Sequence, residues 1–167
     1  MLPLTTVSHK HHDQLGHHVR QLDELADCLN ADCLDSVGLI GHLPQLREAR
    51  DGLTGHLLPH MDTVEAAVHP TLERIMTDHD RVVPMGLEHA EIRRLVAALD
   101  VYIDDPETHQ DRASVLSLRR ILLRLHALLK AHLAEEELYI PILEDRLTPV
   151  EEQALARALD HLATERL

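Results

Sequence analysis

The stretch LHALLKAHLAEEELYIPIL, residues 125–143, carries the pattern that decides the fold. Its apolar residues recur at steps of three and four, which is the spacing of one face of an α-helix. The face extends over residues 112–147 and includes a histidine and a glutamate one turn apart, His132 and Glu136. The whole stripe is Leu118, Leu122, Leu125, Leu129, His132, Glu136, Tyr139 and Leu143. A lone carboxylate in an aliphatic core is costly unless it is paired or binds a metal, so Glu136 requires a partner.

The same helical period occurs in three further segments, residues 8–30, 44–76 and 83–103. A fifth, shorter helix is expected after TPVE, residues 148–151, which is typical of a capping box. No segment shows the alternation of a β-strand. We therefore predict an all-α fold: an up-down four-helix bundle with a short C-terminal fifth helix, forming a single domain over residues 1–167.

Composition narrows the class of function. Of the 167 residues, 44% are hydrophobic and 27% are charged, which is typical of a globular domain. The net charge of −13 argues against nucleic acid and anionic membrane surfaces as partners. There is no signal-peptide core and no apolar run long enough to span a bilayer. Cys28 and Cys33 are expected to be reduced thiols, so we expect a cytoplasmic protein.

Each of the four long stripes carries one inward-facing histidine: His18, His60, His89 and His132. Neutral imidazole is the commonest metal ligand in proteins. Helix bundles that hold two metal ions do so with carboxylates and histidines from facing helices. The four histidines together with Glu136 therefore predict a metal site in the core, although a metal-free hydrogen-bonded pair of His132 and Glu136 is the simpler alternative.

The chain has 15 histidines, and most of the others are expected on the surface or in loops. Three of them compete for a role at the site. His17 is the main rival of His18, His12 is a weaker rival, and His56 lies one turn before His60 and is a candidate extra ligand. The residues assigned to the surface or loops are His9, His11, His12, His17, His42, His69, His79, His109, His126 and His161.

Two segments partly repeat each other. HMDTVEAAVHP, residues 60–70, is similar to HLAEEELYIP, residues 132–141. In both, a glutamate stands five residues before a proline. The histidine precedes the proline by ten residues in the first and by nine in the second, so the repeat is imperfect.

The sequence resembles the hemerythrin family, in its bacterial HHE cation-binding branch. The resemblance spans roughly residues 9–147 and rests on the inward histidine of the first helix, the His–Glu–Pro pattern of the second, LEHAEIRRLV around His89, and LHALLKAHLAEEELYIPIL. It implies a non-haem di-iron centre, of the kind that can be oxo-bridged, that binds or senses dioxygen, nitric oxide or peroxide. It also implies that His18, His60, His89 and His132 are iron ligands and that Glu136 is a bridging carboxylate.

Two positions depart from the family pattern. The family places a glutamate four residues after the histidine of the second helix, where this chain has Val64; Glu65 is the nearest replacement. Five residues is about 140° round a regular helix, but a π-bulge inserts one residue and favours functional sites. Since Pro59 removes a backbone donor just before His60, we expect a distorted turn that aims Glu65 inward.

The second departure is in the third helix, where oxygen carriers of the family have two histidines four residues apart. Here the residues four before and four after His89 are Met85 and Arg93, which makes reversible oxygen storage less favoured. The predicted metal ligands are His18, His60, Glu65, His89, His132 and Glu136. A di-iron enzyme that decomposes peroxide would use the same ligands. A metal-free helical interaction module, with the histidines as core hydrogen-bonders, is the alternative from a different class.

Overall fold

The computed structural model describes residues 4–29, 38–76 and 82–164. The helices of these residues are joined by short turns, and no strand occurs among them. The first helix is α1 (Leu4–Cys28), and the last three are α5 (Val82–Asp104), α6 (Arg112–Arg146) and α7 (Pro149–Thr164). The expected all-α fold and the short fifth helix are confirmed.

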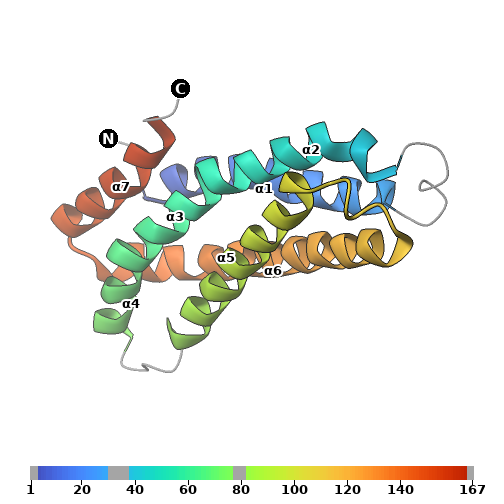
Figure 1. Cartoon of the computed structure of the whole chain (residues 1–167). Helices are drawn as coiled ribbons and strands as arrows, with labels where there is room; N and C mark the ends of the chain where they lie inside the picture. Colours follow the sequence, from blue (N-terminus) through green and yellow to red (C-terminus); the bar gives the residue numbers. More distant parts are fainter. Residues whose placement is uncertain (1–3, 30–37, 77–81, 165–167) are drawn as a thin grey trace.

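The second helix is one long run with two distortions. It consists of α2 (Gly38–Gly52), the π turn η1 (Leu53–Leu57), α3 (Leu58–Thr63), the π turn η2 (Val64–Val68) and α4 (His69–Ile75). Figure 1 shows these pieces following one another as one continuous, curved run. The irregularity expected in this helix is therefore present, and it occurs twice.

The helices pack as a ring of neighbours. α1 contacts both α6 and α2, and α5 contacts the same two helices. α7 lies across one end of the molecule, against α1 and α3 (Figure 1). α7 begins with the predicted capping box, formed by Thr148 and Glu151. The Thr148 backbone N–H donates to the Glu151 carboxylate at 2.9 Å, and Thr148 Oγ1 accepts from the Glu151 N–H at 3.4 Å.

Two helices begin earlier than the sequence predicted. α1 starts at Leu4 rather than at residue 8, because Leu4 and Val7 continue the buried stripe backwards. The second helix starts at Gly38 rather than at Pro44, because Leu39 and Leu43 are buried on the face that continues through Leu46. Pro44 is tolerated inside α2 because it lies on the exposed side of the helix, where water can satisfy the freed carbonyl.

The buried apolar side chains form two clusters. The larger one holds the leucine-rich middle of the bundle, and the smaller one lies toward α7. On α5, Met85 belongs to the smaller cluster and Ile92 to the larger, with His89 between them. On α6, Leu133 and Tyr139 flank Glu136 in the same way. The buried polar residues therefore form a layer between two apolar clusters.

Candidate metal centre

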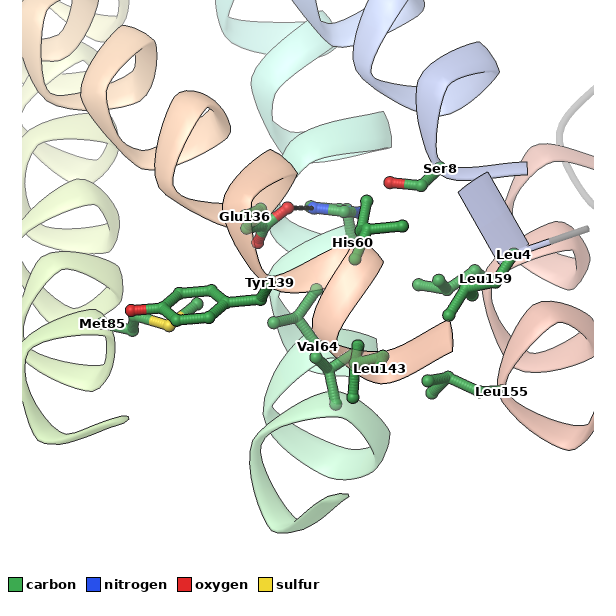
Figure 2. Close-up of a pocket in the computed structure, with 12 residues that line it drawn as sticks. Leu4, Ser8, His60, Val64, Met85, Glu136, Tyr139, Leu143, Leu155 and Leu159 are labelled. Carbon is green, nitrogen blue, oxygen red and sulfur yellow. Dashed lines mark hydrogen bonds and ion pairs between the residues drawn. The ribbon is translucent and has the colours of Figure 1, made fainter. Parts of the chain in front are cut away.

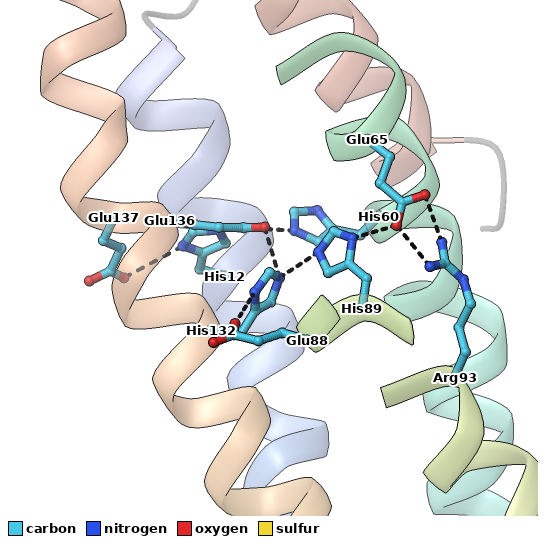
Figure 3. Close-up of polar contacts among 9 residues, drawn as sticks. All are labelled: His12, His60, Glu65, Glu88, His89, Arg93, His132, Glu136 and Glu137. Atoms are coloured by element: carbon cyan, nitrogen blue, oxygen red, sulfur yellow. Dashed lines mark hydrogen bonds and ion pairs between the residues drawn. The ribbon is translucent and has the colours of Figure 1, made fainter. Parts of the chain in front are cut away.

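Four helical runs contribute to the buried polar layer, and Figure 3 shows their side chains converging. The members that lie in the core are His12 of α1, His60 of α3, His89 of α5, and His132 and Glu136 of α6. All five side chains are buried. Because each helix delivers its side chain from a leucine-rich face, ordinary core packing fixes the polar residues against one another.

Glu136 is at the centre of the layer. Its Oε2 atom lies 2.9 Å from His12 Nε2 and 2.9 Å from His60 Nε2. Its Oε1 atom lies 3.0 Å from His132 Nε2, without the alignment of a hydrogen bond. The two carboxylate oxygens therefore face different histidines, which is the arrangement of a bridging ligand.

The Glu136 carboxylate is charged although it is buried. Burial alone would raise its pKa, but contacts with His60, His12 and His132 outweigh burial and hold the pKa well below its usual value. A charged carboxylate in a low-dielectric layer attracts a cation strongly. The site thus holds a carboxylate whose charged form is favoured, surrounded by imidazoles.

The tautomers of His89 and His132 are fixed by carboxylates outside the layer. His89 Nδ1 lies 2.7 Å from Glu65 Oε1, and His132 Nδ1 lies 3.3 Å from Glu88 Oε2. Since a carboxylate only accepts, each Nδ1 carries the proton, which leaves a lone pair on Nε2 when the ring is neutral. A carboxylate that holds the outer nitrogen of a histidine is the usual support for a metal ligand.

The lone pairs fixed in this way point at each other. His89 Nε2 lies 3.0 Å from His132 Nε2, and Glu136 Oε1 is beside them. Burial lowers the pKa of His89 to about 4, with a further contribution from His132, so the His89 ring is neutral. Burial also disfavours charge on His132, but Glu136 and Glu88 outweigh it and raise the pKa of this ring. When His132 is neutral, three acceptor atoms converge on one point; the raised pKa of His132 favours a proton there in the metal-free chain, and a bound metal ion would take its place.

The ligand atoms form two triads. One is His12, His60 and Glu136, and the other is His89, His132 and Glu136; within each triad the atoms lie within 4.8 Å of one another. Because Glu136 belongs to both, the two triads could hold a pair of ions bridged by one carboxylate. Imidazole nitrogen with carboxylate oxygen suits iron, zinc, copper and nickel.

The structure brings together four of the six predicted ligands: His60, His89, His132 and Glu136. His18 is not among them. The α1 ligand position that we predicted for His18 is occupied by His12. His18 lies about 9 Å further along the helix axis. Its Nδ1 atom is 3.1 Å from Gln21 Oε1, and its ring stacks on His56 at 5.3 Å. His56 is exposed and is not in either triad.

The displacement of His18 has a simple cause. The face of α1 that packs into the core runs through Leu15, Val19 and Leu22, so Val19 takes the inward position. His18 is left on the flank, half-buried, with its ring against Gly52.

Glu65 reaches the layer from outside. Its side chain is 37% exposed and is not a member of either triad. Its carboxylate contacts His89 Nδ1 and also accepts from Arg93 at 2.8 and 3.2 Å. Arg93 is the largest cause that holds the pKa of Glu65 below its usual value. The structure therefore places Glu65 as a residue that orients His89 rather than as one of the converging ligands.

Three buried histidines were assigned to the surface or loops by sequence reasoning. His11 and His12 are buried on α1, and His69 is buried at the start of α4. For His11 and His12 the signal was present, because they lie one turn before Leu15 on a stripe that continues back to Leu4. For His69 it was not, because its orientation depends on the π turn η2.

An apolar cavity of about 30 Å³ lies next to Glu136 and His60. Figure 2 shows Val64 and Leu143 on its wall and Leu155 and Leu159 of α7 closing it from the other side. This volume admits a molecule about the size of water. The cavity thus offers a small molecule a position beside the shared carboxylate.

Comparison of the chain with family models, with curated proteins and with solved structures finds no match. None of the described helices is long and apolar enough to cross a membrane. Function must therefore be inferred from the side-chain geometry and from the resemblance in sequence.

Proposed function

We propose that this chain is a non-haem di-iron protein that binds or senses dioxygen, nitric oxide or peroxide inside an up-down four-helix bundle of the hemerythrin type. The observation that carries the proposal is the convergence of His89 Nε2, His132 Nε2 and Glu136 Oε1, three acceptors without a donor among the described groups when both rings are neutral. In a metal-free helical module the only relief would be one proton on His132. The choice of iron rests on the sequence resemblance, and the donor set is compatible with it.

Each residue has a distinct part in this proposal. Glu136 would bridge the two ions, with His12 and His60 on one and His89 and His132 on the other. Glu65 and Glu88 would hold the Nδ1 protons and keep the Nε2 lone pairs inward. Bound iron would supply open coordination positions for a small ligand.

The cavity supports a small, uncharged ligand. Its wall is mainly aliphatic, and the lining residues with polar groups are Ser8, His60, Glu136 and Tyr139. An anionic ligand would lose its hydration there and face the negative carboxylate of Glu136. Dioxygen and nitric oxide therefore fit the space better than a larger or anionic molecule.

Metal content tests the proposal. Protein produced with added iron is expected to contain about two irons per chain, a count that follows from the two triads, and to absorb in the near ultraviolet where oxo-bridged iron does. Protein that carries no iron, and takes up none when ferrous iron is added to the metal-free chain without oxygen, would contradict it.

His12 and His18 give opposite predictions on the same helix. His12→Leu should weaken binding of one of the two ions by about 100-fold or more, because it removes a nitrogen from one triad. His18→Leu should leave both ions in place, because this ring contacts Gln21 and His56 instead. Iron titration of the two metal-free variants measures the difference. A loss of iron in His18→Leu alone would assign the ligand to His18.

Val64 lies on the cavity wall, so a substitution at this residue tests whether nitric oxide binds in the cavity. Val64→Leu should weaken nitric oxide binding by about tenfold at unchanged iron content, because one more methylene occupies the space beside Glu136. Val115→Leu is the control, because Val115 is equally buried but belongs to the larger apolar cluster. Equal nitric oxide affinity in both variants would place the ligand elsewhere.

A further inference from the structure

Two buried histidines near the triads have nitrogen atoms without a partner among the described residues. His11 is 5% exposed, and neither of its ring nitrogens makes a hydrogen bond. His69 is 8% exposed, and its Nε2 atom makes none. Buried polar atoms are almost always paired, so two such rings in one layer require an explanation.

The two rings are distributed evenly over the site. The His11 ring lies 4.7 Å from the ring of His60, and the His69 ring lies 5.4 Å from the ring of His89, measured between centroids. Two imidazoles bound side by side to one ion have centroids about 4.5 to 5.5 Å apart, given metal–nitrogen distances of about 2.0 Å. Each triad therefore has one additional histidine at the spacing of a neighbouring ligand.

The π turn η2 explains how His69 comes to the layer. His69 follows His60 by nine residues, which in a regular α-helix would put the two side chains half a turn out of phase. η2 lies between them and takes up one extra residue, so the pair behaves as if eight residues apart and the angle between the two side chains falls from about 180° to about 80°. The helix thus departs from regular geometry where this is needed to bury His69 next to His89.

Each ring has a buried nitrogen atom that no described group engages: both ring nitrogens of His11, and Nε2 of His69. Burial also lowers the pKa of both rings. A neutral imidazole has one free lone pair, which is the form that binds a metal.

We propose that His11 and His69 are metal ligands: His11 for the ion held by His12 and His60, and His69 for the ion held by His89 and His132. This rests on the proposed metal centre and deepens it by naming its donor set. Each ion would have three imidazoles and a share of the single carboxylate of Glu136. A ring rotation is needed, because neither histidine belongs to a triad as the structure stands.

This donor set predicts which metals are accepted. Imidazole nitrogen favours iron, cobalt, nickel, copper and zinc, whereas magnesium, calcium and manganese prefer oxygen. With six nitrogens and one carboxylate, the site is expected to reject magnesium even in excess. We therefore expect the proposed centre to bind divalent ions of the later first-row transition metals.

Cobalt titration of the full-length metal-free chain tests the two assignments, because the visible absorption of Co²⁺ reports both its affinity and its coordination. The wild type is expected to bind two equivalents tightly. His11→Leu and His69→Leu are each expected to keep one tight equivalent and to bind the other about 100-fold more weakly. His126→Leu is the control, because His126 is half-buried and its Nδ1 contacts the Val19 carbonyl.

Thermal unfolding of the metal-free variants separates ligation from folding. Leucine in place of an unpartnered buried imidazole should leave the metal-free Tm unchanged or raise it, so weaker cobalt binding cannot come from a damaged fold. His11→Gln and His69→Gln, which keep a polar side chain, should show the same loss of affinity. Two tight equivalents in all four variants would overturn this inference while leaving the metal centre intact. A wild-type chain that binds no cobalt would overturn both.

Discussion

Glu136→Gln is expected to remove metal binding from both halves of the site at once, whereas each histidine substitution affects one half. Glu136 is the only residue that the two triads share. Its Oε2 faces His12 and His60 while its Oε1 faces His132. Replacing this carboxylate with a neutral amide therefore removes the negative charge that would face both ions. The amide also places an NH₂ donor where an acceptor is needed. Affinity should fall by about 100-fold or more for each ion, measured by titrating the metal-free variant with iron or cobalt.

Glu135→Gln is the matched control. Glu135 is the adjacent residue, is half-buried, and accepts a hydrogen bond from the Tyr139 hydroxyl at 2.8 Å outside the triads. The Glu135→Gln variant should bind two ions, as the wild type does. If Glu136→Gln kept one ion at full affinity, the carboxylate would serve one half alone, and the shared-ligand arrangement would be wrong.

The helices were predictable because their faces are regular. On α5 and α6 buried residues recur at steps of three and four along almost the whole helix, and the expected ends lie within one residue of Val82–Asp104 and Arg112–Arg146. The first residues of α1 and α2 were not predicted, because few apolar residues mark the buried face there. They are Leu4 and Val7 on α1, and Leu39 and Leu43 on α2. Local periodicity therefore predicts a helix well in its middle and less well at an end.

Within the site, the residues on regular stripes were predictable and the others were not. His60, His89, His132 and Glu136 all lie on stripes that the leucines define. Choosing between His12 and His18 required the rotation of α1 against its neighbours, which the choice of Val19 as the inward residue decides. A π turn was anticipated from Pro59 and Glu65, but its consequence for His69 follows only from the three-dimensional path of the helix.

Removing the metal is expected to lower the Tm of the protein by about 10 °C or more. Without an ion, the layer holds a buried carboxylate and converging lone pairs that a single proton on His132 relieves only in part. A ligand at 1,000 times its Kd stabilises the folded state by about 4 kcal/mol. For a chain of this length each kcal/mol shifts the Tm by about 2 to 4 °C. Thermal unfolding of the iron-loaded protein, with and without a chelator, measures the change.

The size of this shift separates a buried site from surface binding. Glu136→Gln should show little effect of the chelator, since it has lost the shared ligand of both triads. Magnesium added to the metal-free wild type should not restore the Tm, because a nitrogen-rich donor set suits it poorly. An iron-loaded protein whose Tm ignores the chelator would mean that its iron is bound at the surface. The buried histidines would then be a structural layer held by hydrogen bonds to Glu136 and Glu65, with a proton on His132 between the His89 ring and Glu136.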